Sequence, residues 1–134
     1  MINGIKVQDL RFIGESDRGS TYEFDCDRQG PFTIGFRKAG SVNGRHYHEG
    51  RSSQKGPEVF ILLHGTMDVY ARNLQTGEEM RNAYQAPVQL EISPNVWHEI
   101  VAVTDITFIE LNSIAEHSKD TKYAADLKAA VEKE

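Results

Sequence analysis

Three histidines and one glutamate in this chain have the types and the spacing to hold a single metal ion. His46 and His48 are separated by one residue, and such residues project from the same face of a β-strand, so both imidazoles can reach one ion. Glu58 begins the next apolar run, and His98 follows a turn before another such run. Three imidazoles and a carboxylate with open positions suit one divalent transition metal, whether Fe, Mn, Ni, Co or Zn, and the sequence does not choose among these.

An ion of this kind supports more than one chemistry. With an open position it could bind adjacent oxygens of a hydroxy-carbonyl substrate and acidify the C–H bond between them, which is the chemistry of an isomerase. The same open positions on iron could activate dioxygen instead. A third reading is a binding module that holds a small molecule, such as a sugar, without catalysis.

Further candidates lie elsewhere in the sequence. Glu110 could act as a general base, or it could be a carboxylate at the rim that is bonded to its neighbours. Arg37 could bind an anionic group of a substrate, or it could be a solvated surface residue. We expect His64, beside a turn, and His117, after the last strand, to be solvated, and we expect Cys26 to be a small core residue.

Short apolar or alternating segments separated by Gly, Asn, Pro and Ser predict strands for nearly the whole of residues 1–112. The predicted strands are Ile5–Phe12, Thr21–Asp25, Phe32–Lys38, Gly44–His48, Glu58–Leu63, Met67–Asn73, Glu79–Tyr84, Val88–Ile92, Val96–Val103 and Ile106–Asn112. Regular spacing of this kind indicates a barrel or a sandwich. From Thr121 onward, apolar residues recur every four positions and predict a short C-terminal helix at about 121–133, with Asp120 as its N-cap.

Composition limits the class of protein. A length of 134 residues suits a single domain, expected to span residues 1–134 with its barrel at about 5–112. The net charge of −5 and the lack of a basic block exclude nucleic acid as an expected partner. No apolar run is long enough to span a membrane, the first residues lack the basic and apolar regions of a signal peptide, and Cys26 has no second cysteine to pair with, so we expect a cytoplasmic protein.

These residues together resemble the cupin superfamily, whose fold is an all-β double-stranded β-helix, also called a jelly roll. The first cupin motif is matched at Gly40, His46, His48, Glu58 and Gly65. Nine residues separate His48 from Glu58 where the motif has three or four, so 49–57 is predicted to be an inserted loop. The spacing to Gly65 favours Glu58 over Glu49 as the ligand. Small cupins commonly pair through a strand edge or a sheet face, and we therefore expect a homodimer.

The second cupin motif is matched in part. His98 keeps its place, Ser93 and Asn95 stand at the proline and glycine positions, and Ala102 replaces the final Asn. Asn95 tolerates the left-handed conformation that this turn requires. Trp97, next to His98, is predicted to face away from the site and to pack in the sheet or in a dimer contact.

A weaker resemblance is to the small cupins that act as thymidine-diphosphosugar 3,4-ketoisomerases and to related sugar epimerases. It rests on the segments 31–34, 96–99 and Arg18-Gly19, together with the histidine pair. Those enzymes use histidines of the pair as acid and base without a metal, and a Gln usually fills the position that Glu58 occupies here. The carboxylate favours a metal. The resemblance therefore implies a metal-binding sugar or sugar-nucleotide isomerase or epimerase acting on a small-molecule substrate, with a metal-dependent dioxygenase and a non-catalytic sugar-binding cupin as alternatives.

Overall fold

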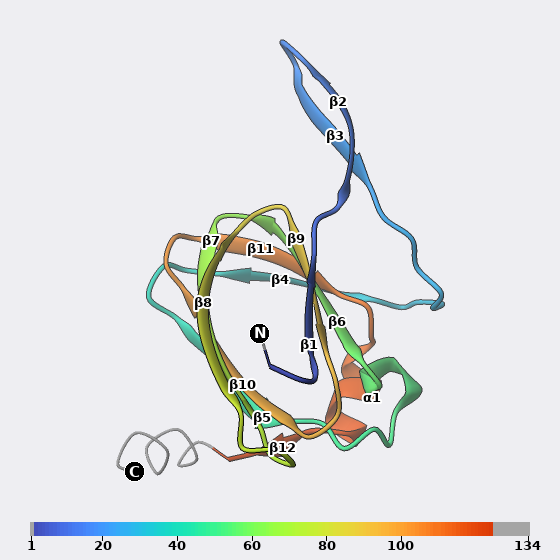
Figure 1. Ribbon diagram of the computed structural model, residues 1–134. Coiled ribbons are helices and arrows are strands. Elements are labelled where there is room, and N and C mark those ends of the chain that lie inside the picture. Colours follow the sequence, from blue (N-terminus) through green and yellow to red (C-terminus); the bar gives the residue numbers. More distant parts are fainter. Residues whose placement is uncertain (1, 125–134) are drawn as a thin grey trace.

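The computed structural model describes residues 2–124, which form two five-stranded antiparallel sheets and a separate two-stranded hairpin (Figure 1). The strands are β1 (Ile5–Gln8), β2 (Arg11–Ser16), β3 (Gly19–Glu23), β4 (Thr33–Arg37), β5 (Val42–Tyr47), β6 (Glu58–His64), β7 (Thr66–Asn73), β8 (Glu79–Gln85), β9 (Val88–Ile92), β10 (Val96–Ala102), β11 (Ile106–Glu110) and β12 (Lys122–Tyr123). One sheet has the order β1-β9-β6-β11-β4 and the other has the order β12-β5-β10-β7-β8. The predicted all-β jelly roll is confirmed.

The two sheets enclose the core because alternate residues of each strand face inward. Ile100 and Ala102 of β10 lie in the same buried cluster as Phe60 and Leu62 of β6. Phe108 of β11 stacks on the ring of Phe60 with centroids 4.5 Å apart. Glu58 begins β6 and His98 lies on β10, so the alternation that builds the apolar core also turns both side chains into the barrel.

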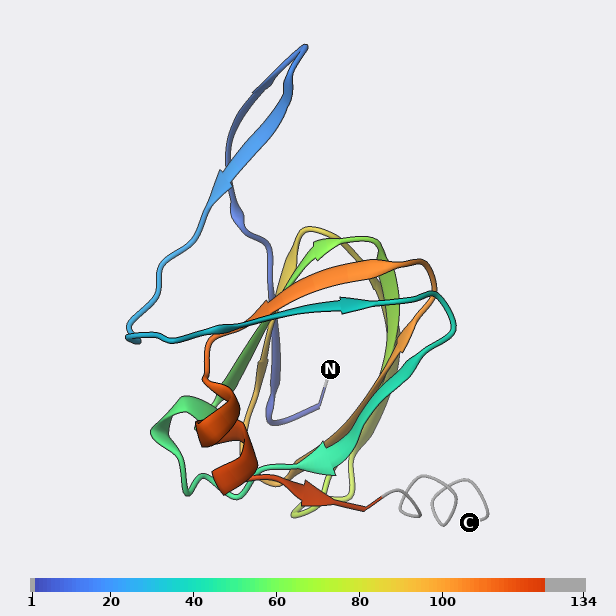
Figure 2. The same ribbon diagram turned by 180° about the vertical axis from the view of Figure 1, so that it is seen from behind.

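The hairpin of β2 and β3 projects away from the barrel in two opposite views (Figures 1 and 2). The predicted strand Ile5–Phe12 is therefore divided. Its first half, β1, pairs with β9, and its second half belongs to the hairpin. Cys26 follows the end of β3 and is exposed, so the prediction that it is a core residue was wrong: its alternating segment leads away from the barrel and not into it.

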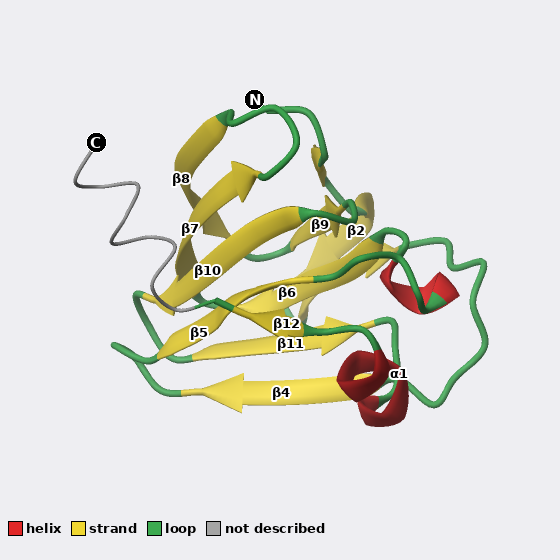
Figure 3. Ribbon diagram, turned by 90° about the horizontal axis from the view of Figure 1, so that it is seen from below, coloured by secondary structure: helices red, strands yellow, loops and turns green. Residues whose placement is uncertain are grey.

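The C-terminal segment differs from its prediction. The helix of this region is α1 (Ile114–Lys119), and Ser113 caps it by accepting a hydrogen bond from the backbone N–H of Glu116. Asp120 lies at the C-terminal end of α1, and the following residues form β12, which pairs with β5 (Figure 3). The predicted helix is thus wrong for residues 121–124, and the rest of it lies outside the described residues. Within residues 2–124 no helix is long and apolar enough to cross a membrane.

Candidate functional site

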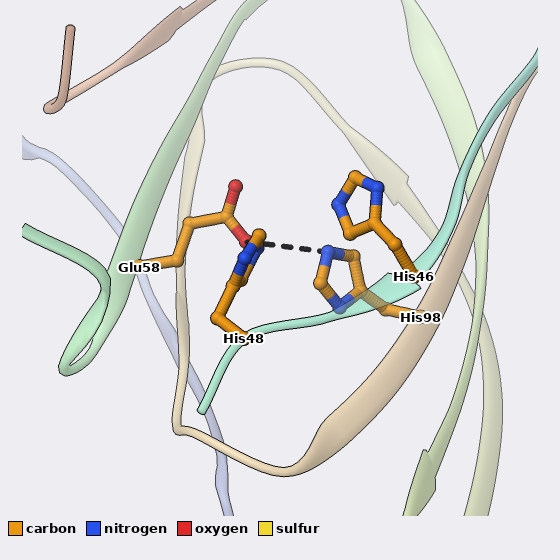
Figure 4. Close-up of side chains that lie close together, drawn as sticks. All are labelled: His46, His48, Glu58 and His98. Atoms are coloured by element: carbon orange, nitrogen blue, oxygen red, sulfur yellow. Dashed lines mark hydrogen bonds and ion pairs between the residues drawn. The ribbon is translucent and has the colours of Figure 1, made fainter. Parts of the chain in front are cut away.

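The structure brings the four predicted ligands together inside the barrel (Figure 4). His46 lies on β5 and His98 on β10 of the same sheet, and His48 directly follows the end of β5. Glu58 faces them from β6 in the opposite sheet. All four side chains are buried, and one potential ligand atom from each lies within 4.8 Å of the others. The cluster contains the three ligands that the first cupin motif predicts and the one, His98, that the second motif predicts.

A β-bulge places two of the histidines opposite each other. His46 pairs with His98, whereas Gly44 pairs with Glu99, so Arg45 is an extra residue on β5. Gly44 and Arg45 both have positive φ, at 87° and 58°. A bulge redirects the side chains next to it, and here the rings of His46 and His98 meet edge to face with centroids 4.7 Å apart.

Backbone carbonyl groups set the tautomers of two rings. Nδ1 of His48 lies 2.7 Å from the carbonyl oxygen of Asp120, and Nδ1 of His98 lies 3.0 Å from that of Val96. A carbonyl oxygen only accepts, so each Nδ1 carries the proton, and in the neutral ring Nε2 presents its lone pair. Both Nε2 atoms face the same oxygen of Glu58, Oε2, at 2.9 Å for His48 and 3.2 Å for His98. A lone pair and a carboxylate oxygen repel each other, so without a metal ion these rings are protonated and donate Nε2–H to Glu58, and a metal ion between them would take the place of those protons.

His46 completes a donor set that fits a divalent ion. Burial, followed by the positive charge of nearby His98, lowers the pKa of His46 to about 2, so its ring is neutral at physiological pH. Its Nδ1 is buried and has no hydrogen-bond partner among the described residues. These are features of a transition-metal site: one neutral imidazole with an unpartnered buried nitrogen, two rings fixed through Nδ1–H, and one carboxylate.

Lys55 was not predicted as part of the site. It belongs to the short 3-10 helix Ser53–Lys55 in the loop between β5 and β6, and its side chain is fully buried. Its ammonium donates to Oε1 of Glu58 at 3.1 Å and lies 3.7 Å from Oε2 of Glu110. Burial alone would raise the pKa of Glu58, but hydrogen bonds with His48 and His98, and then the charge of Lys55, hold it well below its ordinary value.

The cluster opens into a cavity of about 190 Å³. Its wall includes His46, Glu58 and His98 from the cluster, together with both further candidates, Glu110 and Arg37. Burial, and then the nearby charge of Glu58, raises the pKa of Glu110.

Arg37 lies at the edge of this cavity and is exposed. Its Nε donates to Oδ1 of Asn43 at 2.8 Å, and its guanidinium lies 5.2 Å from the centre of the Phe108 ring. Its Nη1 also donates to the carbonyl oxygen of Phe36 at 3.0 Å, so two of the three guanidinium nitrogens hold the side chain in place. The structure thus puts the candidate anion-binding residue at the same cavity as the cluster of three histidines and Glu58.

His117 was predicted to be solvated, and this was wrong. Its ring lies on α1 against the cluster, with its centroid 5.3 Å from that of His46, and it lines the cavity. Burial, and then the charge of Lys55, lowers its pKa to about 4. Tyr123 of β12 also lines the cavity, with its ring 5.3 Å from His46. His64, by contrast, is exposed as predicted.

Two other predictions concern residues around the cluster. Trp97 is fully buried in the sheet, where it contacts the ring of Tyr70 and donates from Nε1 to the carbonyl of Ala124, so its predicted packing is confirmed. Asn95 has a φ of 65°, the left-handed conformation that was expected at this turn. Glu49, the rival of Glu58, is not part of the cluster, and its carboxylate lies 3.4 Å from the guanidinium of Arg51.

The fold and the buried cluster together define a protein with the cupin jelly roll. Among solved structures, the chain is similar to dTDP-4-dehydrorhamnose 3,5-epimerase from Sulfolobus tokodaii, with a TM-score of 0.70 and 16% identity over 92% of this chain and 78% of that one. It is similar to a double mutant of the QdtA 3,4-ketoisomerase from Thermoanaerobacterium thermosaccharolyticum in complex with TDP, with a TM-score of 0.70 and 21% identity over 99% and 97% of the two chains. It is also similar to a double mutant of ChmJ, a 3'-monoepimerase from Streptomyces bikiniensis in complex with dTDP, with a TM-score of 0.76 and 13% identity over 97% and 73%. No family model matches the sequence, and no curated protein matches it. The resemblance drawn from the sequence is confirmed at the level of the fold.

Proposed function

We propose that this protein is a metal-dependent isomerase or epimerase that acts on a keto-sugar linked to a nucleotide. The observation that carries the proposal is the arrangement of His48 and His98, whose Nδ1–H groups are held by carbonyls while both Nε2 atoms face one oxygen of Glu58. His46 supplies a third imidazole. The likeness of the fold to that of dTDP-sugar epimerases and ketoisomerases supports the substrate class.

The size of the cavity supports a sugar ring as the group that enters the barrel. Its volume of about 190 Å³ is smaller than the roughly 300 Å³ or more of pockets for drug-sized ligands. A nucleoside diphosphate would therefore stay outside the barrel, beside the exposed guanidinium of Arg37. Nε and Nη1 of Arg37 donate to Asn43 and Phe36, so the other terminal nitrogen would donate to a phosphate oxygen.

Proton transfer would fall to Glu110. A bound divalent ion would polarise the carbonyl group and make the neighbouring C–H bond more acidic. Glu110 lies in the same cavity wall, and its raised pKa makes it a stronger base than an ordinary carboxylate. It would take the proton from carbon and return it on the same face to the adjacent carbon, while the hydroxyl proton passes to the former carbonyl oxygen. Epimerisation would need a second acid that protonates the opposite face of the carbon.

The test is exchange with solvent deuterium. Chelator-treated protein would be incubated with dTDP-4-keto-6-deoxyglucose in D₂O, with and without Mn²⁺, Co²⁺ or Zn²⁺, and followed by proton NMR. We expect loss of the signal next to the keto group only when an ion is present, and we expect Glu110→Gln to abolish it. The matched control Glu91→Gln changes a partly exposed carboxylate on β9 that is paired with Lys6. Oxygen uptake with Fe²⁺ and no exchange would indicate a dioxygenase, whereas binding without any turnover would indicate a sugar-binding protein.

We also propose that the protein is a homodimer in which the hairpin of β2 and β3 packs on a second copy. An isolated two-stranded hairpin is marginally stable in water, and this one exposes four large apolar side chains: Phe12, Ile13, Tyr22 and Phe24. At the edge of the first sheet, β4 exposes Ile34 and Phe36. The hairpin of one copy on β4 of the other would cover both apolar surfaces and the open sheet edge. A cytoplasmic location stays a prediction.

A further inference from the structure

The loop 49–57 carries a lysine into the centre of the protein. The side chain of Lys55 is completely buried, with 0% of it accessible to solvent. A buried ammonium costs several kcal/mol unless it is paired, and Lys55 is paired with the carboxylates of Glu58 and Glu110. It is absent from the residues that line the cavity, so any effect on the site passes through these two carboxylates.

The loop that carries Lys55 is anchored on several sides. Ser52 donates from its backbone N–H to Asp120 at 3.1 Å and from its hydroxyl to Glu116 at 2.5 Å. Arg28 donates to the carbonyl oxygens of Gln54 and Pro57 from the other side of the loop. Side chains from two distant parts of the sequence, Arg28 and the segment with Glu116 and Asp120, thus fix the loop just before and just after Lys55.

The ammonium determines how Glu58 is presented. Lys55 takes Oε1 of Glu58 at 3.1 Å, while Oε2 of the same carboxylate faces His48 and His98. With Oε1 held in this way, the carboxylate has one orientation and offers one oxygen to the imidazoles. The positive charge also lies on the side of Glu58 opposite to the histidines.

We propose that Lys55 is a positioning residue, supplied by the inserted loop, that restricts Glu58 to a single oxygen facing the histidines and weakens the affinity of the cluster for divalent ions. The second half of this statement rests on the proposed metal site. A unit charge on the order of 6 Å from a divalent ion changes its affinity about tenfold even with the dielectric screening of bulk water. Loss of the ammonium should therefore increase metal affinity, because it removes this repulsion and frees the second oxygen of Glu58.

The test uses Co²⁺ as the probe, added to chelator-treated wild type, Lys55→Met and Lys6→Met. Lys6 is exposed and paired with Glu91, so its substitution removes the same charge from the surface of the protein. Calorimetry should show at least tenfold tighter Co²⁺ binding to Lys55→Met, and its visible absorption spectrum should differ from that of the wild type, while Lys6→Met should match the wild type in both. Equal affinity and equal spectra for Lys55→Met and wild type would overturn the proposal.

A second variant and a second measurement keep the proposal testable if Lys55→Met does not fold. Lys55→Met leaves two buried carboxylates without their ammonium, whereas Lys55→Met combined with Glu110→Gln removes one charge of each sign. Metal-free crystal structures of the variant that folds should show Glu58 rotated, with Oε2 no longer shared by His48 and His98. An unchanged Glu58 would refute the positioning role. If wild type binds no Co²⁺, the metal site of the proposed function fails, and the orientation of Glu58 still decides the role of Lys55.

Discussion

The carboxylate of Asp120 connects the C-terminal segment to the loop between β5 and β6. It is 2% exposed, its Oδ1 accepts the backbone N–H of Glu49 at 2.8 Å, and its Oδ2 accepts those of Gly50 and Ser52 at 3.0 and 3.1 Å. Burial would raise the pKa of Asp120, but these three hydrogen bonds outweigh it and lower the pKa. The carbonyl of the same residue holds Nδ1 of His48, so Asp120 supports both the loop and a predicted metal ligand.

Asp120→Asn is the substitution that tests this role. The amide has one accepting oxygen, so at least one of the three backbone N–H groups must face an NH₂ group. A hydrogen bond to a charged group contributes about 1.5–3 kcal/mol, and a buried donor left without a partner costs about 1–3 kcal/mol. We therefore expect a loss of about 3 kcal/mol in the free energy of unfolding. For a chain of this length, that loss corresponds to a decrease in Tm of roughly 10 °C.

The assay is urea and thermal unfolding at pH 7, with Asp105→Asn as the matched control. Asp105 is exposed and accepts one backbone N–H, that of Ala39, so its substitution should cost less than about 1 kcal/mol. The stabilisation from ionised Asp120 is present above its unfolded pKa of about 3.9 and is lost as the pH falls through its lower folded pKa, so the difference between wild type and Asp120→Asn should narrow only in strong acid. Equal losses for the two variants at pH 7 would refute the reasoning.

Three further predictions follow from the site and the fold. The unfolded chain takes up a proton at His46 below about pH 6.5, and the folded metal-free chain does so only near pH 2. Each unit by which the pH is lowered in this interval should therefore reduce the contribution of His46 to the free energy of unfolding by about 1.4 kcal/mol. Urea unfolding should show a shallower dependence of this free energy on pH for His46→Gln than for wild type. Gly44→Ala should destabilise the protein by about 1–3 kcal/mol from its φ of 87° alone, and its Cβ would lie 2.8 Å from the carbonyl oxygen of His98; a Tm equal to that of wild type would show that the bulge is not required. Sedimentation should give twice the 15.1 kDa chain mass for wild type and a single chain for Phe36→Lys on β4, and a wild-type monomer at micromolar concentration would contradict the dimer.

The part of the site that the sequence predicts is the part governed by local periodicity. His46 and His48 share a face because strand side chains alternate, and Glu58 points inward because it has the same parity on β6 as the core residue Phe60. The apolar runs around them also predict most of the strands. These relationships depend on neighbours in the sequence, so they can be derived without knowledge of the tertiary structure.

The residues that the sequence does not predict reach the site through long-range contacts. Lys55 lies in an inserted loop, where a lysine is ordinarily solvated. Its burial is explained by its ion pairs with the carboxylates of Glu58 and Glu110. His117 reaches the cluster because α1 folds back over the opening of the barrel, and Ser113 with Glu116, which caps this helix, was the sequence signal that could have located it. Cys26 has the alternation of a core strand, but its hairpin leaves the barrel.

The central claim is that the four residues form the metal site of a sugar isomerase or epimerase. Its most direct test is calorimetric titration of chelator-treated wild type and Glu58→Gln with Mn²⁺, Co²⁺ and Zn²⁺, with deuterium exchange into the keto-sugar measured on the same samples. We predict that each wild-type chain binds one ion. Because Gln keeps the shape of Glu58 and removes its charge, the variant should bind the ion at least tenfold more weakly and should lose deuterium exchange together with the ion. A wild type that binds no ion, with exchange intact in both proteins, would contradict it.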